Sequence, residues 1–80
     1  MNNVSNTKQD LSKENSRSRI LESALQIFST KGFEGASVSD IVQAAGVTKP
    51  TLYYFFTNKE SLYKAVWKEN FDDFLKNLKV

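Results

Sequence analysis

Apolar residues recur at intervals of three and four along most of this chain, and glycines interrupt the pattern where helices would end. The first run predicts a helix over about residues 20–30. Its apolar positions are Ile20, Leu21, Ala24, Leu25, Ile27 and Phe28. Gly32 then supplies a left-handed residue that closes a helix, and Phe33 is placed to fold back on Phe28. No segment shows the alternation of a strand, so the sequence predicts an all-α fold.

A second helix is predicted over about residues 37–45. Ser37 is followed three residues later by Asp40, which resembles a capping box. The apolar positions of this helix are Val38, Ile41, Val42 and Ala45. Gly46 ends it after about two turns, because glycine adopts the left-handed conformation without steric cost.

Two further helices follow. Thr48 can cap a third helix over about residues 48–56, with Pro50 in its first turn, where the missing N–H costs no hydrogen bond. A long fourth helix opens within residues 57–60, where Thr57 and Asn58 are rival caps. Its apolar stripe consists of Leu62, Tyr63, Val66, Trp67, Phe71, Phe74, Leu75 and Leu78.

The second and third helices form a helix-turn-helix candidate over about residues 37–56. In this motif the second helix of the pair presents its opening turn to the major groove, while its other side holds the core. Leu52 and Phe56, four residues apart, are the expected anchors. The residues expected to contact DNA are Ser37, Ser39, Thr48, Lys49, Pro50, Thr51, Tyr53, Tyr54 and Lys59.

The chemistry of these side chains suits DNA. Lys49 can meet a phosphate or a guanine edge, as threonine hydroxyls can, and the Pro50 ring can lie against a thymine methyl. Tyr53 and Lys59 suit phosphates. Aromatic residues on short helices are usually core, which favours burial of Tyr54, although its hydroxyl can still reach the DNA backbone.

Composition excludes several other functions. The chain has no cysteine or histidine, which removes disulfides, imidazole bases and the common zinc sites. It also lacks a glycine-rich phosphate loop, so we expect no enzyme, cofactor or metal. No apolar run approaches the roughly 18 residues that span a bilayer, and the polar start does not suit a signal peptide, which favours a cytoplasmic protein.

Charge is unevenly distributed along the chain. Residues 48–59 carry two lysines and no acid, a pattern that suits a polyanion. Arg17 and Arg19 stand near the start of the first helix, where cations oppose the helix dipole. They are therefore either solvated or a sign of a phosphate partner, unless the helix begins earlier, near Ser12.

Residues 37–63 resemble the DNA-binding signature of the tetracycline-repressor (TetR) family, most sharply at residues 46–54, Gly-Val-Thr-Lys-Pro-Thr-Leu-Tyr-Tyr. Residues 20–33 resemble that family's first helix. The resemblance implies a homeodomain-like, three-helix DNA reader, whose fourth helix leads into a larger domain that binds an effector and dimerises. It further implies a bacterial transcriptional regulator, a repressor released by a small molecule, that binds a palindromic operator as a homodimer.

The resemblance also assigns roles to individual residues. It places Ser37 and Ser39 in contacts from the second helix, residues 48–51 toward bases, and Tyr53 and Lys59 on phosphates. Two positions depart from the family pattern. Phe55 stands where histidine is frequent and cannot donate to a phosphate, and Pro50 stands where glycine is frequent.

The chain divides into three expected parts: a flexible polar arm at residues 1–15, the DNA-binding domain at 16–67, and residues 68–80 as the start of a missing domain. The apolar stripe beyond Trp67 exceeds what the first helix can cover, which favours a fragment over a natural minimal protein. Such a fragment is expected to be a monomer or a weak dimer. The alternative function is a helical interaction or dimerisation module without DNA binding, in which the fourth helix docks into a groove.

Overall fold

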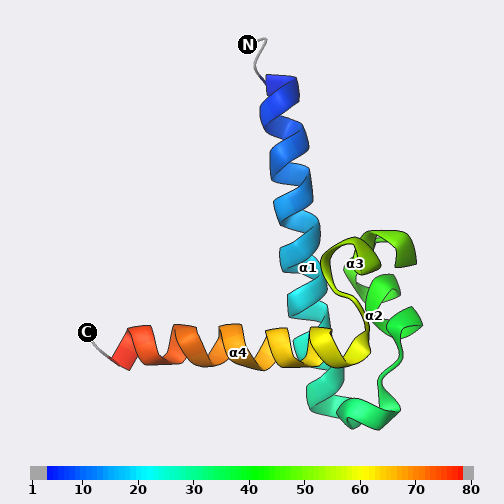
Figure 1. Cartoon of the computed structure of the whole chain (residues 1–80), viewed down its shortest axis with the longest axis vertical. Coiled ribbons are helices and arrows are strands. Elements are labelled where there is room, and N and C mark those ends of the chain that lie inside the picture. The colour runs from blue at the N-terminus through cyan, green and yellow to red at the C-terminus, as the bar shows by residue number, and fades with distance from the viewer. Residues whose placement is uncertain (1–3, 79–80) are drawn as a thin grey trace.

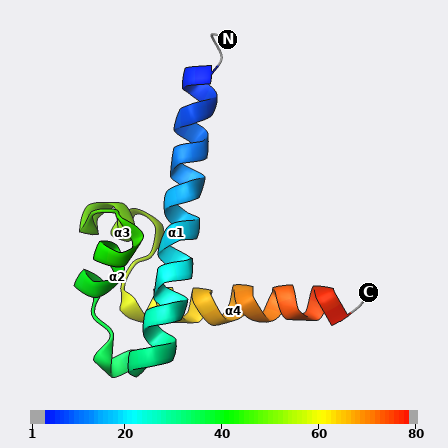
Figure 2. The same ribbon diagram turned by 180° about the vertical axis from the view of Figure 1, so that it is seen from behind.

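The computed structural model describes the backbone of residues 4–78 and the side chains of residues 15–72. Over this range the chain forms α1 (Val4–Gly35), α2 (Val38–Ala45), α3 (Lys49–Phe55) and α4 (Lys59–Leu78), without a strand. The predicted all-α fold is confirmed. Figures 1 and 2 show the long helices α1 and α4 crossing, with the short helices α2 and α3 packed together beside α1. None of the helices in this range has both the length and the apolar character needed to cross a membrane.

The first helix begins earlier than the sequence predicts. Its backbone is helical from Val4, whereas the apolar pattern starts only at Ile20. No glycine or proline stands between residues 4 and 31, so nothing in that segment breaks a helix. The apolar pattern therefore marks where α1 joins the core and not where the helix starts. The flexibility of the arm at residues 1–15 stays a prediction, and residues 1–3 lie outside the described range.

Gly32 interrupts α1 as predicted. Its φ of 76° and ψ of 172° fall in a region that only glycine populates readily, so the turn differs from a left-handed helical cap, which has ψ near +47°. The chain then folds back, and the rings of Phe28 and Phe33 stack with centroids 6.0 Å apart. This turn directs the chain toward α2.

The core takes one large, fully buried aliphatic side chain from each helix. Ile20, Ile41, Leu52 and Leu62, from α1 to α4 in order, are all 0% exposed. Burial of one such side chain stabilises the fold by about 1.5–3 kcal/mol relative to its exposure. No polar or charged side chain among residues 15–72 is buried with them. Apolar packing therefore fixes the positions of all four helices.

The starts of α2, α3 and α4 share one device, a side chain that accepts a hydrogen bond from the backbone N–H three residues later. Ser37 Oγ accepts from Asp40 at 2.9 Å, and Thr48 Oγ1 accepts from Thr51 at 3.3 Å. Asn58 Oδ1 accepts from the N–H of Ser61 at 2.8 Å, and the N–H of Asn58 donates to Ser61 Oγ at 3.1 Å. Asn58, and not Thr57, is therefore the cap of α4.

Candidate nucleic-acid interface

The turn between α2 and α3 is a Schellman motif. Gly46 has φ 73° and ψ 33°, the left-handed conformation that the sequence predicts. Its N–H donates to the carbonyl oxygen of Gln43 at 3.3 Å, and the N–H of Val47 donates to that of Val42 at 3.0 Å. This tight turn brings Thr48, the cap of α3, directly behind the end of α2.

Helix α3 has a core face and an open face. Leu52 and Phe56, the expected anchors, are 0% and 5% exposed. On the open face, Thr48, Lys49 and Pro50 are exposed, Thr51 is half-buried and Tyr53 is 47% exposed. The opening turn is therefore uncovered by any described part of the chain, as a helix that enters a groove requires.

Tyr54 does not lie in the core. It is 68% exposed, so the preference for burial was wrong. Leu52 and Phe56 define the core side of α3, and Tyr54, midway between them along the helix, points to the other side. Its ring packs edge-on against half-buried Phe55, with centroids 4.9 Å apart. The exposed position keeps Tyr54 among the candidate DNA contacts.

Both candidate serines at the start of α2 are exposed. Ser37 already accepts the capping hydrogen bond from the N–H of Asp40. The hydrogen bond with Ser37 and the nearby Lys31 ammonium lower the pKa of the Asp40 carboxyl below its ordinary value. The Asp40 carboxyl therefore stays ionised to a lower pH than an ordinary aspartate. Lys31 Nζ, 3.4 Å away, offsets its charge beside the two serines.

Lys49 differs from the other cations near the interface. Among the side chains of residues 15–72, its ammonium makes no hydrogen bond or ion pair, whereas Arg17, Arg19 and Lys59 all donate to protein oxygens. Close by, Thr48 Oγ1 and Thr51 Oγ1 lie 3.0 Å apart and share a hydrogen bond. The open face of α3 thus offers one uncommitted positive charge next to a pair of hydroxyls.

Lys59 is held by the protein. Its Nζ donates to the carbonyl oxygens of Phe33 at 2.7 Å and Ala36 at 2.9 Å, and it lies 4.4 Å from the centre of the Phe33 ring. These contacts tie the start of α4 to the turn after Gly32 and use two of the three ammonium donors. The sequence showed the charge but not these acceptors, because they are backbone atoms brought near by the fold. A phosphate contact by Lys59 stays a prediction.

The two arginines near the core end of α1 are not simply solvated. Arg17 pairs with Glu69 of α4, and Arg19 donates to backbone carbonyl oxygens at the end of α2. The unfavourable position relative to the helix dipole that the sequence suggested does not apply, because α1 begins at Val4, earlier even than the alternative start near Ser12. The sequence could not identify the partners of the two arginines, which lie 26 to 52 residues away.

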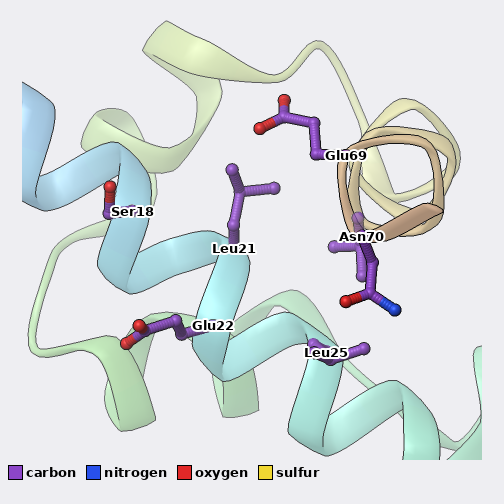
Figure 3. Close-up of a pocket in the computed structure, with 7 residues that line it drawn as sticks. Ser18, Leu21, Glu22, Leu25, Glu69 and Asn70 are labelled. Carbon is purple, nitrogen blue, oxygen red and sulfur yellow. The ribbon is translucent and has the colours of Figure 1, made fainter. Parts of the chain in front are cut away.

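A shallow pocket lies between α1 and α4 (Figure 3). Leu21 and Leu25 line it from α1, and Glu69 and Asn70 line it from α4. None of its lining residues comes from α2 or α3, so this pocket is separate from the candidate interface.

Comparisons with known proteins agree on one family. The sequence model of "Bacterial regulatory proteins, tetR family" matches residues 20–66. The chain is 43% identical over 58 residues to "HTH-type transcriptional repressor ComR" of Escherichia coli, covering 72% of this chain and 28% of that protein. It is 45% identical over 60 residues to "HTH-type transcriptional regulator RutR" of Escherichia coli, covering 75% and 28%.

A third relative comes from another bacterium. The chain is 36% identical over 62 residues to "Biofilm operon icaADBC HTH-type negative transcriptional regulator IcaR" of Staphylococcus aureus, covering 78% of this chain and 33% of that protein. The chain thus matches about 28% to 33% of the length of these three relatives.

Proposed function

Because this chain belongs to the TetR family of bacterial regulatory proteins, we propose that it is the DNA-reading module of a transcriptional regulator and binds double-stranded DNA sequence-specifically. This family is one of transcription regulators and not a class of enzymes. The exposed opening turn of α3, with the uncommitted ammonium of Lys49, carries the proposal. A groove-reading helix needs this combination of a free leading turn and a fixed rear face.

The individual contacts follow from position and chemistry. Residues 48–51 lead α3 and would face base edges, with Lys49 donating to guanine and the Pro50 ring against a thymine methyl. The hydroxyls of Tyr53 and Tyr54 would donate to phosphates, as would Ser37 and Ser39 from the start of α2. Lys59 has one ammonium donor left for a phosphate beside its two carbonyl bonds.

The finer parts of the proposal rest on the relatives. Two of the three are named as a repressor or a negative regulator, which supports repression. Their greater length supports a further domain in the complete regulator, and we place effector binding and dimerisation there. A homodimer would read a palindromic operator with half-sites about 34–36 Å apart, in the cytoplasm where the DNA lies. This chain alone would bind one half-site, as a monomer or a weak dimer.

The test is selection of bound sequences from a pool of random duplexes. We expect enrichment of one short motif by the wild-type chain and its loss in the double variant Lys49→Ala, Tyr53→Ala. Lys68→Ala is the matched control, because Lys68 is an exposed lysine of α4. Failure of the wild-type chain to enrich any motif would contradict DNA reading, as would equal enrichment by the double variant.

A dimerisation module without DNA binding makes the opposite prediction. It would associate through apolar surface, with little dependence on salt, and show no affinity for duplexes. Sedimentation and duplex binding over a range of salt concentrations separate the two functions.

A further inference from the structure

Arg19 joins the first helix to the turn of the helix-turn-helix. Its Nε donates to the carbonyl oxygen of Ala45 at 3.0 Å, and its Nη2 donates to that of Gly46 at 3.2 Å. The planar guanidinium presents its donors in a fixed fork, so two bonds to neighbouring carbonyls define the position of the turn more closely than one bond would. Arg19 thus contacts residues that lie 26 and 27 positions away in the sequence.

The turn supplies no backbone donor to either of these two carbonyls. The Schellman hydrogen bonds use the carbonyl oxygens of Val42 and Gln43. Arg19 supplies donors to the carbonyls of Ala45 and Gly46, at the negative end of the α2 dipole, where a cation is favourable. A Cβ atom built on Gly46 would lie 3.5 Å from Nη2 of Arg19, which shows how closely the guanidinium covers the turn.

The apolar side chains by which α3 packs on the core begin at Leu52. The helix is seven residues long, and Leu52 is the one residue within it that is buried. Half-buried Phe55 and the buried Phe56 that follows add to this attachment, whereas the opening turn of α3 is exposed and carries no buried side chain. The α2–α3 turn is therefore a second point of support, and Arg19 fixes that turn on α1.

We propose that Arg19 is a positioning residue for DNA recognition, which sets the direction of α3 by holding the carbonyls of the α2–α3 turn. This inference rests on the proposed function. It differs from a direct phosphate contact, because a positioning residue affects how well α3 distinguishes base sequences and leaves the number of phosphate contacts unchanged.

The experiment uses the whole chain as wild type, Arg19→Ala and Arg19→Lys, with Lys68→Ala as a control for loss of one exposed charge. Affinities are measured over a range of salt concentrations for the duplex selected by the wild type and for a scrambled duplex. We expect Arg19→Ala to lower the ratio of the two affinities by about tenfold, which corresponds to the lower end of the range for a hydrogen bond to a charged group. The dependence of affinity on salt concentration should stay unchanged. Arg19→Lys should restore part of the ratio, since an ammonium lacks the fork that serves both carbonyls.

Amide hydrogen exchange gives a measurement that needs no DNA. The N–H groups of Gly46 and Val47 are hydrogen-bonded in the turn, and we expect both to exchange faster in Arg19→Ala while amides in the middle of α4 are unaffected. Retained protection in α4 also shows that the variant is folded.

A salt slope lowered by about 1 in Arg19→Ala would indicate a phosphate contact and overturn the proposal. An unchanged affinity ratio would overturn it as well, and so would unchanged exchange in the turn. If the wild-type chain prefers neither duplex, the proposed function fails, and the role of Arg19 in recognition fails with it. Amide hydrogen exchange alone then decides whether Arg19 holds the turn.

Discussion

The guanidinium of Arg17 on α1 donates two hydrogen bonds to the carboxylate of Glu69 on α4, at 2.6 and 3.3 Å. The same guanidinium carbon lies 5.4 Å from the centre of the Phe56 ring, at the end of α3. Arg17 therefore contacts α4 and also Phe56, the residue that ends α3. The hydrogen bonds from Arg17 lower the pKa of Glu69, and those to Glu69 raise the pKa of Arg17.

This pair makes stability depend on pH in the acidic range. Since the pKa of folded Glu69 lies below its ordinary value of 4.5, the pair stabilises the fold above that value and loses its effect as pH falls through the lowered pKa. The two side chains are 42% and 44% exposed, and solvent screening limits the effect to about 0.2–1 kcal/mol. Denaturant unfolding of wild type and Glu69→Gln should differ near neutral pH and converge well below 4.5. A difference that persists in acid would contradict the assignment.

The left-handed turn at Gly46 should not accept a side chain. Gly46→Ala places a Cβ at φ 73°, and we expect the free energy of unfolding to fall by about 1–2 kcal/mol. Gly35→Ala is the matched control, because Gly35 has no positive φ and its new Cβ would make only an ordinary contact with Lys31. Thermal unfolding of both variants provides the measurement. Equal melting temperatures for the two variants would show that the left-handed conformation at position 46 does not require glycine.

Lys59 should contribute to the stability of the fold whether or not it contacts DNA. Lys59→Met keeps the apolar stem but removes both hydrogen bonds to the carbonyls after Gly32, and we expect a loss of about 1–3 kcal/mol in stability. If the third donor meets a phosphate, the salt slope of duplex binding also falls by about 1. Unfolding and binding are measured on the same preparation. Reduced stability with an unchanged slope would remove Lys59 from the DNA contacts.

Lys49 should show the reverse behaviour. Lys49→Ala removes an exposed side chain without a protein partner among residues 15–72, so we expect no change in unfolding. On the preferred duplex it should cost about 1–3 kcal/mol and alter base preference at one position. Lys68→Ala, the control, should change neither quantity. A uniform loss on all sequences would indicate that Lys49 meets a phosphate and not a base.

Much of the fold could be predicted because its boundaries are set locally. The capping side chains of Ser37 and Thr48 and the positive φ values of Gly32 and Gly46 act within a few residues of the chain. The core face of α3 was also predictable, since two apolar residues four apart define one side of a helix. The start of α1 was not, because nothing between residues 4 and 31 breaks the helix and the apolar pattern reports only contact with the core.

The partners of the charged side chains could not be predicted. Arg19 and Lys59 donate to backbone carbonyls, which every residue carries and which leave no trace in the sequence. Tyr54 shows a different limit. Its aromatic character favoured the core, but a seven-residue helix has too narrow an inner face to bury it beside Leu52.

The three local caps, at Ser37, Thr48 and Asn58, also bear on how fast the chain folds. Each closes a loop of only a few residues, so α2, α3 and α4 can begin before distant parts of the chain meet. Helical domains whose contacts are mostly local reach the native state in microseconds to milliseconds. A newly synthesised chain would therefore spend little time with its apolar residues exposed to other unfolded molecules.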